Sequence, residues 1–274
     1  MRKLIAIVAV TALLGVLATP AGISVFPLVQ ELLLPPGTSY SNTIQVENVS
    51  EEPVKITVQV VGFMAPEGIP QFLDPAQDRY PFSGKDLLTI EPAQQEVLPG
   101  ETATFHYTVT MPADLDPYGG RYLAAVFRAE PVEVEAGAQV VVAAQVASLF
   151  LIDPGGEAAP HLKVADIKAY PSVDDPHKIV LEALVTNDGN LHISSDQIRG
   201  YVYITDEDGY VVDEFSAHTH TVLPGNAYIH REVWQAPQDL PSGKYYLHLG
   251  LVLFAPDPEH PQHLFITAPI TLKF

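Results

Sequence analysis

The chain reads Val97-Leu98-Pro99-Gly100, then Pro112-Ala113-Asp114-Leu115, then Gly120-Arg121-Tyr122, in one stretch that ends at Phe127 and decides the fold. It repeats this series further on, as Val222-Leu223-Pro224-Gly225, Pro237-Gln238-Asp239-Leu240 and Gly243-Lys244-Tyr245. The first two pairs of motifs lie 125 residues apart (222 − 97 and 237 − 112), and the third has drifted to 123 (244 − 121). A repeat of this length predicts two related domains rather than a solenoid.

The repeated series predicts β-strands joined by turns. A Pro-Gly pair favours a turn because Pro fixes φ and Gly tolerates positive φ. After the first such pair the segment 104–110 alternates, with Phe105, Tyr107 and Val109 on one face, which is the period of a strand. The 25 prolines and the many short apolar runs bounded by turn residues also favour an all-β chain.

The Gly-x-Tyr step of the repeat resembles the tyrosine corner of immunoglobulin-like sandwiches, in which a Tyr hydroxyl bonds back to the preceding turn. Tyr122 and Tyr245 are the candidates for such structural corners. Two residues later, where an antibody domain has its second cysteine, the chain has Ala124 and Leu247, so packing alone would seal each core. The alternative is that both tyrosines are ordinary strand aromatics.

The N-terminus has the pattern of a signal peptide. Arg2 and Lys3 precede an apolar run from Leu4 to Ala18, and small residues follow it, so residues 1–21 are predicted to be removed on export. The run is shorter than the roughly 20 residues that span a bilayer. Cleavage is therefore favoured, and an uncleaved N-terminal segment would be the protein's contact with a membrane.

Composition narrows the classes of partner. The formal net charge is −19, and loss of Arg2 and Lys3 moves it to −21 (−19 − 2), which disfavours nucleic acid and anionic lipid. The chain has no cysteine, so it has neither disulfides nor the lipid-bearing cysteine of a lipoprotein. The expected localisation is the periplasm or the extracellular cell surface.

The predicted fold class is all-β, with two immunoglobulin-like β-sandwich domains in tandem after the signal peptide. The expected domains are residues 22–154 and 161–274, joined by a short linker at 155–160. The Pro-rich segment 64–85 is predicted to be an inserted loop, which either caps one end of the first sandwich or binds a partner.

One predicted strand, 138–152, is apolar on both faces. Val140, Val142, Ala144 and Val146 share one face, and Gln139 and Gln145 are the only polar side chains on the other face. Such a strand is either buried centrally or lies at an edge that another chain extends. We expect the edge, which makes those four residues the candidate partner-binding residues.

No motif predicts catalysis, a cofactor or a metal. The chain has no nucleophile elbow, no phosphate-binding glycine loop and no cysteine nucleophile. The run 206–209, Asp-Glu-Asp-Gly, starts like a calcium loop but lacks the later ligands, and an Asp-Gly hairpin turn accounts for it. His218 and His220 share a strand face as metal ligands would, yet nothing completes a ligand set, so an exposed strand is favoured.

Taken together, the mature chain resembles the two-domain immunoglobulin-like envelope proteins of bacteria, which include the periplasmic pilus chaperones and the WxL-interacting proteins. The resemblance is carried by Leu88-Thr89-Ile90-Glu91-Pro92, Val97 to Glu101, Gly119-Gly120-Arg121-Tyr122 and Asn187-Asp188-Gly189-Asn190. Two departures limit it. The segment 148–154 keeps the Leu-Phe and Pro of the pilus chaperones but has no basic residue, and the chain lacks the C-terminal membrane helix usual in WxL-interacting proteins.

The resemblance implies a non-catalytic, exported envelope protein that binds another surface or secreted protein through its immunoglobulin-like domains. The alternative is a periplasmic chaperone-like protein that donates or pairs a β-strand with an exported subunit. A third and less favoured class is an enzyme or a sugar-binding module.

Overall fold

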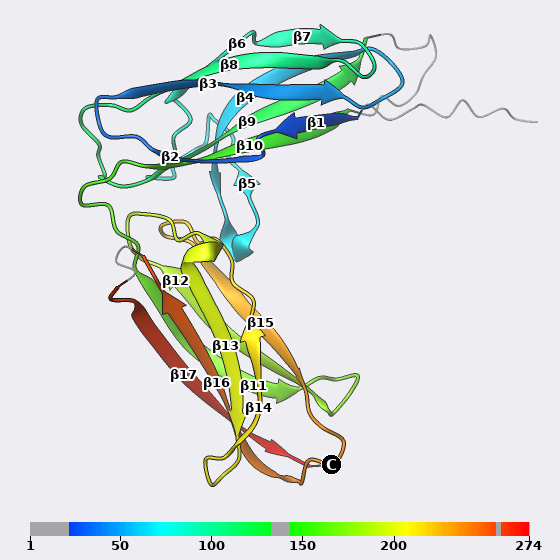
Figure 1. The fold of residues 1–274 in the computed structure, drawn as a ribbon, viewed down its shortest axis with the longest axis vertical. Coiled ribbons are helices and arrows are strands. Elements are labelled where there is room, and N and C mark those ends of the chain that lie inside the picture. Colours follow the sequence, from blue (N-terminus) through cyan, green and yellow to red (C-terminus); the bar gives the residue numbers. More distant parts are fainter. Residues whose placement is uncertain (1–21, 133–142, 256–258, 274) are drawn as a thin grey trace, which may run out of the picture.

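The computed structural model describes residues 22–132, 143–255 and 259–273 and is built almost entirely of β-strands (Figure 1). The exceptions are two single-turn 3₁₀ helices, Pro66–Gly68 and Ser195–Gln197. In the parts of the chain that the structure describes, no helix is long and apolar enough to cross a membrane. The predicted signal peptide, residues 1–21, lies outside the described residues.

The first sandwich packs a four-stranded sheet on a six-stranded sheet, and their inner faces enclose one apolar core. In spatial order the smaller sheet has strands β1 (Ile23–Phe26), β3 (Ser39–Asn48), β8 (Thr102–Thr110) and β6 (Leu88–Glu91). The larger sheet has β2 (Val29–Leu33), β10 (Ala144–Asp153), β9 (Arg121–Pro131), β4 (Val54–Met64) and β5 (Gln71–Phe72), with β7 (Gln94–Val97) also paired to β4. The alternation predicted for segment 104–110 is confirmed, because Phe105, Tyr107 and Val109 are all buried in this core.

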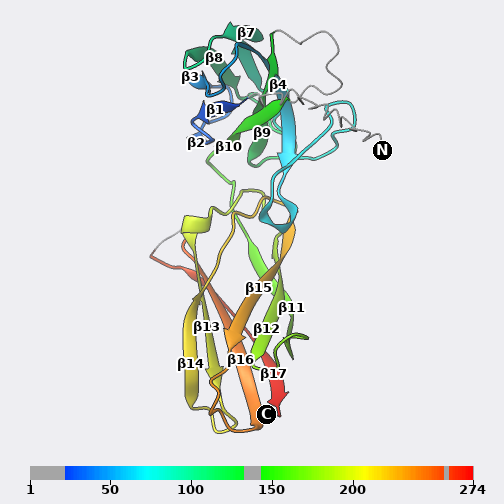
Figure 2. The same cartoon turned by 90° about the vertical axis from the view of Figure 1, so that its right-hand side faces the viewer.

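The second sandwich lies beyond the short connection from β10 and packs three strands on four (Figures 1 and 2). One sheet has β11 (Leu162–Pro171), β12 (Lys178–Asn187) and β15 (Ala227–Gln235). The other has β14 (Val211–Ala217), β13 (Ile198–Thr205), β16 (Gly243–Leu253) and β17 (Gln262–Leu272). The predicted fold class, all-β with two immunoglobulin-like sandwiches in tandem, is therefore confirmed.

Tyr245 has the geometry of a tyrosine corner. Its ring lies in the core of the second sandwich, and its hydroxyl donates a 2.7 Å hydrogen bond to the carbonyl oxygen of Pro241, four residues upstream. Leu247, two residues on, is buried in the same core. This bond ties the start of β16 to the turn that precedes it.

Tyr122 does not form a corner, and that prediction is wrong. In β9 the core-facing residues are Leu123, Ala125 and Phe127, so Tyr122 lies on the opposite face of its strand. Its hydroxyl accepts a 2.8 Å hydrogen bond from the backbone N–H of His192, in the second sandwich. The two tyrosines of the repeat therefore do not superpose, because they differ by one residue in strand phase.

Candidate partner-binding edge

Strand β10 is paired on both sides along only half its length. Residues 149–152 pair with β9 antiparallel and with β2 parallel, and Asp153 pairs with β2 alone. Residues 144–148 pair with β9, and within the described residues no strand pairs with their other edge. That half of β10 therefore presents unpaired backbone groups, which another extended chain is able to pair with.

The open edge exists because the chain changes sheets just before β2. Strand β1 pairs with β3 in the smaller sheet, and β2 begins three residues later in the larger one. Pairing of β2 with β10 begins where Leu149 donates its N–H to the carbonyl oxygen of Leu28, 2.8 Å away. Strand pairing with the crossover segment therefore begins only at Leu149, the buried Ser148 contacts the crossover through its side chain, and residues 144–147 are left open on that edge.

Buried polar side chains fix the place of this crossover. Ser148 is fully buried, and its hydroxyl donates to the carbonyl oxygen of Pro27 at 2.7 Å. The amide of Gln30 donates to the same hydroxyl at 3.3 Å, and the hydroxyl of Tyr107 donates to the Gln30 side-chain oxygen. Burial, the main cause, raises the pKa of Tyr107 to about 12, so its hydroxyl remains a donor. Since each of these groups has a partner, the register of β2 on β10 is specified.

Two of the four predicted partner-binding residues, Ala144 and Val146, lie within the described part of the chain. Ala144 and Val146 are half-buried and pack against the core of the first sandwich, as one face of the strand. Gln145, between them, is exposed on the other face. Val140 and Val142 lie outside the described residues. The role of all four residues in binding stays a prediction.

Exposed apolar side chains accompany the open edge, and the sequence analysis did not identify them. Phe26 at the end of β1, Leu28 before β2, and Val29 and Leu33 in β2 are 71%, 54%, 51% and 72% exposed, respectively. The segment has the period of an ordinary opening strand, and that pattern does not predict these side chains on the surface. Phe26, Leu28 and Val29 lie where the pairing of β2 with β10 begins, next to the open half of β10, and form an apolar strip that a partner strand would cover, whereas Leu33 lies opposite Asp153 at the far end of β2.

A basic anchor for a partner carboxylate is absent from the described part of this edge. The nearest buried cation is Arg121, at the start of β9. Its guanidinium donates to the carbonyl oxygens of Pro117, Gly119 and Gly120 at 2.7–3.0 Å, and burial lowers its pKa. The donors of Arg121 are used within the chain, and Arg128, which lies opposite Gln145 on β9, forms an ion pair with Glu130, so the described edge offers mainly backbone and apolar contacts.

The predicted long loop 64–85 closes onto the second sandwich. Its backbone N–H at Ala65 donates to the Asn226 side-chain oxygen at 2.8 Å, and the hydroxyl of Tyr80 donates to the carbonyl oxygen of Pro224 at 2.8 Å. A carboxylate oxygen of Glu67 accepts the N–H of Ile229 at 3.0 Å. The loop therefore joins the two sandwiches, a role the sequence analysis did not assign to it.

A buried cluster fills the junction behind this loop. Tyr122 stacks edgewise on His192, with ring centroids 5.6 Å apart, and Leu223 of the second sandwich packs beside them. Burial lowers the pKa of His192 to about 4 and raises that of Tyr122 well above its usual value. His192 is therefore neutral at pH 7, and this cluster joins the two sandwiches through uncharged side chains.

The remaining sequence candidates do not form a catalytic or metal site. Residues 206–209 form the predicted hairpin turn, in which the Asp206 carboxylate accepts the N–H groups of Asp208 and Tyr210. His218 lies 3.2 Å from Glu232, while His220 packs on the ring of Tyr228 instead. Among the residues that the structure describes, no group of three or more His, Asp or Glu is placed to hold a metal ion.

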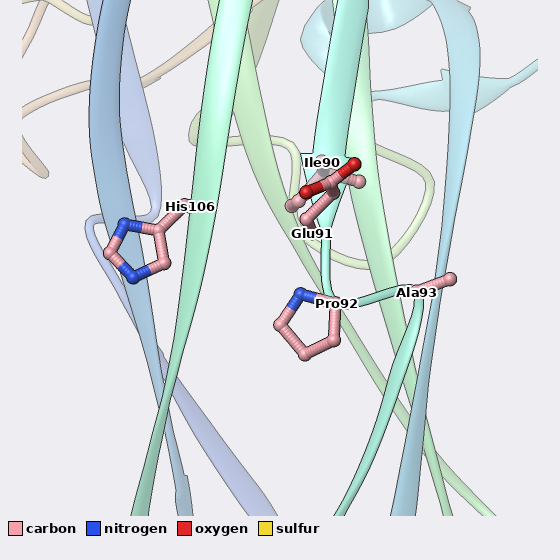
Figure 3. Close-up of a pocket in the computed structure, with 5 residues that line it drawn as sticks. All are labelled: Ile90, Glu91, Pro92, Ala93 and His106. Atoms are coloured by element: carbon pink, nitrogen blue, oxygen red, sulfur yellow. The ribbon is translucent and has the colours of Figure 1, made fainter.

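The hollow shown in Figure 3 is a shallow, open groove between β6 and the start of β7, lined by Ile90, Glu91, Pro92, Ala93 and His106. The Glu91 carboxylate and the His106 imidazole point apart rather than toward a common point (Figure 3). Without convergent polar groups the groove does not have the character of an active site.

No protein-family model and no curated protein matches the chain. Solved structures with a similar fold include pilus chaperones. The class 5 fimbriae chaperone CfaA is 14% identical, with a TM-score of 0.46 over 90% of this chain and 99% of that one. The YadV chaperone is 12% identical, with a TM-score of 0.45 over 89% and 98%. The E. coli chaperone DraB is 11% identical, with a TM-score of 0.40 over 92% and 97%. The resemblance to WxL-interacting proteins stays a prediction.

Proposed function

We propose that this chain is a non-catalytic, exported, chaperone-like protein that pairs an extended segment of another envelope or surface protein with the open edge of β10. The observation that carries the proposal is the half-paired state of that strand: residues 149–152 have partners on both sides and residues 144–148 on one. A partner strand would satisfy the free backbone groups, and side chains at alternate positions would supply selectivity.

The apolar strip beside the edge supports the same function. Phe26, Leu28 and Val29 are each more than half exposed, which is costly for a chain that has no partner. Some of the solved structures with a similar fold are described as complexes of a chaperone with a pilin or with a tip adhesin. For this chain the corresponding partner would be an exported subunit with an apolar, strand-forming segment.

The junction between the sandwiches supports a rigid presentation of the edge. Three hydrogen bonds from the loop 64–85 and the buried Tyr122–His192 contact hold the second sandwich against the first. A fixed angle between the domains lowers the entropy lost when a partner that contacts both of them binds.

Site-specific photo-crosslinking in the producing cell tests the proposal. A photoreactive amino acid at Gln145, exposed on the open half of β10, is expected to crosslink an exported protein. The same amino acid at Gln95, exposed on β7, is the matched control and should give no such product. Identical products from both positions, or none from Gln145, would contradict pairing at this edge.

The lifetime of the crosslinked product separates a chaperone from a permanent binding partner. After protein synthesis is stopped, a chaperone should lose the product as its subunits mature. A product that persists at constant level would instead favour a stable complex with another envelope protein.

A further inference from the structure

The outer face of the four-stranded sheet in the second sandwich carries a row of aromatic side chains. Along β13 and β16 the residues alternate strictly: Val202, Ile204, Leu247 and Leu249 point into the core, so Tyr203 and His248 point outward. Figures 1 and 2 show no other described element in front of this face. It lies in the other sandwich from the open edge of β10, and the proposed function makes no use of it.

The aromatic rings form a continuous stack across three neighbouring strands. Tyr203 and His248 are cross-strand partners, with ring centroids 4.4 Å apart and planes 18° from parallel. Phe265 of β17 lies 5.6 Å from Tyr203 and 5.5 Å from His248, again nearly parallel. Tyr201 extends the stack along β13, at 6.3 Å and 12° from Tyr203. Phe265 is 54% and Tyr201 is 39% exposed, so the outer members of the stack face solvent.

Neighbouring residues hold these rings in place. The imidazole of His248 is hydrogen-bonded on both sides, through Nε2 to the Thr205 hydroxyl at 3.0 Å and through Nδ1 to the Thr267 hydroxyl at 2.8 Å. The Tyr201 ring lies over Gly250, where an added Cβ would stand 2.1 Å from the ring carbon Cζ. Glycine is therefore required at position 250 for the ring to lie against the strand. Rings fixed in this way lose little side-chain freedom when a ligand binds.

We propose that this aromatic face, defined by Tyr201, Tyr203, His248 and Phe265, binds a neutral, linear oligosaccharide. The C–H groups on the faces of a sugar ring are weakly positive and apolar, and they stack on the negative faces of aromatic rings. The face is open rather than a pocket, so it suits an extended chain that lies along the sheet. Polar side chains at its margin, Arg199, Lys244 and Glu214, are exposed, and Lys244 lies over the ring of Tyr246 at 5.0 Å.

Charge favours a neutral ligand over an anionic one. The whole chain has a formal net charge of −19, which repels polyanions at long range. The two cations at the margin are accompanied by Glu214, which pairs with Tyr203 in the β13–β14 register. The ring stack itself carries no charge while His248 is neutral, and burial lowers the pKa of that imidazole.

Calorimetric titration of the purified full-length mature protein tests the proposal. The probes are three neutral hexasaccharides, β-linked glucose, β-linked N-acetylglucosamine and β-linked mannose, and one anionic oligosaccharide, a hexamer of galacturonic acid. At least one neutral probe is expected to bind, and Phe265→Ala and Tyr201→Ala should each weaken it about tenfold. Tyr210→Ala, which removes a 72% exposed tyrosine in the β13–β14 turn, is the matched control and should bind normally.

Tyr201→Phe keeps the ring, so it should keep most of the affinity, and circular dichroism confirms that each variant is folded. Absence of binding to all three neutral probes would overturn the proposal, as would binding of the anionic probe alone. Binding that survives both alanine variants in folded protein would place the sugar elsewhere. Dimerisation that Phe265→Ala abolishes, in the absence of any sugar binding, would show that a second copy of the chain occupies this face.

Discussion

Asn48 and Asn187 hold equivalent places in the two sandwiches, and each fastens a Leu-Pro-Gly turn to the end of a strand. The Nδ2 group of Asn48 donates to the carbonyl oxygens of Glu52 and Val97, and that of Asn187 donates to those of Leu191 and Val222. Val97 and Val222 are the first residues of the repeated Val-Leu-Pro-Gly motif. Both asparagines are buried, at 0% and 1% exposure.

Asn187→Ala is expected to lower the free energy of unfolding of the second sandwich by about 1–3 kcal/mol, because it removes the donor to the Leu191 and Val222 carbonyl oxygens and the acceptor for the N–H groups of His161 and Gly189. Urea unfolding, followed by the fluorescence of Trp234 in that sandwich, measures the change. Asn42→Ala, at an exposed position of β3, is the control and should change stability little. An unchanged midpoint in Asn187→Ala would mean that water replaces the side chain at no cost.

Tyr245→Phe should lower the stability of the second sandwich by about 1 kcal/mol, since it deletes the hydroxyl that bonds to Pro241 while keeping the ring in the core. The matched control is Tyr246→Phe, one residue along and on the outer face of β16. Equal stability of the two variants would show that the hydroxyl of Tyr245 contributes nothing beyond what solvent supplies.

The strand faces of the first sandwich could be predicted from alternation, but the phase of β9 could not. In β8 every second residue is polar, so Phe105, Tyr107 and Val109 identify the core. In β9 both faces are apolar and seven consecutive residues, 121–127, are buried. The two-residue alternation of a strand therefore does not identify the face of β9 that meets the other sheet. The sequence analysis assigns Tyr122 to the core-facing position, which Leu123 occupies in the structure.

The asparagine pair and the closing loop were missed for related reasons. The two asparagines lie 139 residues apart (187 − 48), whereas the turns they hold lie 125 apart, so a fixed period does not align them. The loop 64–85 has no period at all, and its function depends on contacts with Asn226 and Pro224, far away in sequence. Such contacts arise from tertiary packing, which single-sequence patterns do not contain.

Acid should weaken the junction between the sandwiches through His192. Its pKa is lowered from an ordinary value of 6.5 to about 4 by burial, so the unfolded chain takes up the proton first. The stabilisation by neutral His192 is complete above about pH 6.5 and is lost as the pH falls toward 4, by about 3 kcal/mol in total. Urea unfolding at pH 7.0 and 4.5 should show a smaller loss in His192→Gln than in the wild type. Equal losses would show that other groups cause the acid sensitivity.

Ser148→Ala should loosen β2 without unfolding the protein. The hydroxyl of Ser148 donates to Pro27 and accepts from Gln30, so its removal frees the crossover that precedes β2. Amide hydrogen exchange in residues 29–33 should become faster, while exchange in β16 stays unchanged. Faster exchange in both sandwiches would indicate global destabilisation, and slow exchange everywhere would show that backbone pairing alone holds β2 in place.

Ala144→Lys should weaken partner capture at the open edge of β10. Position 144 is half-buried at the edge of the first core, so a lysine there can extend its charge to solvent while placing it where a partner strand would lie. Gln95→Lys, exposed on β7, introduces the same side chain away from this edge and is the matched control. The yield of the photo-crosslinked product from Gln145 should fall at least severalfold in the first variant and stay constant in the second. Circular dichroism separates loss of binding from loss of fold, and a folded Ala144→Lys protein that captures its partner at full yield would exclude the open half of β10 as the binding edge.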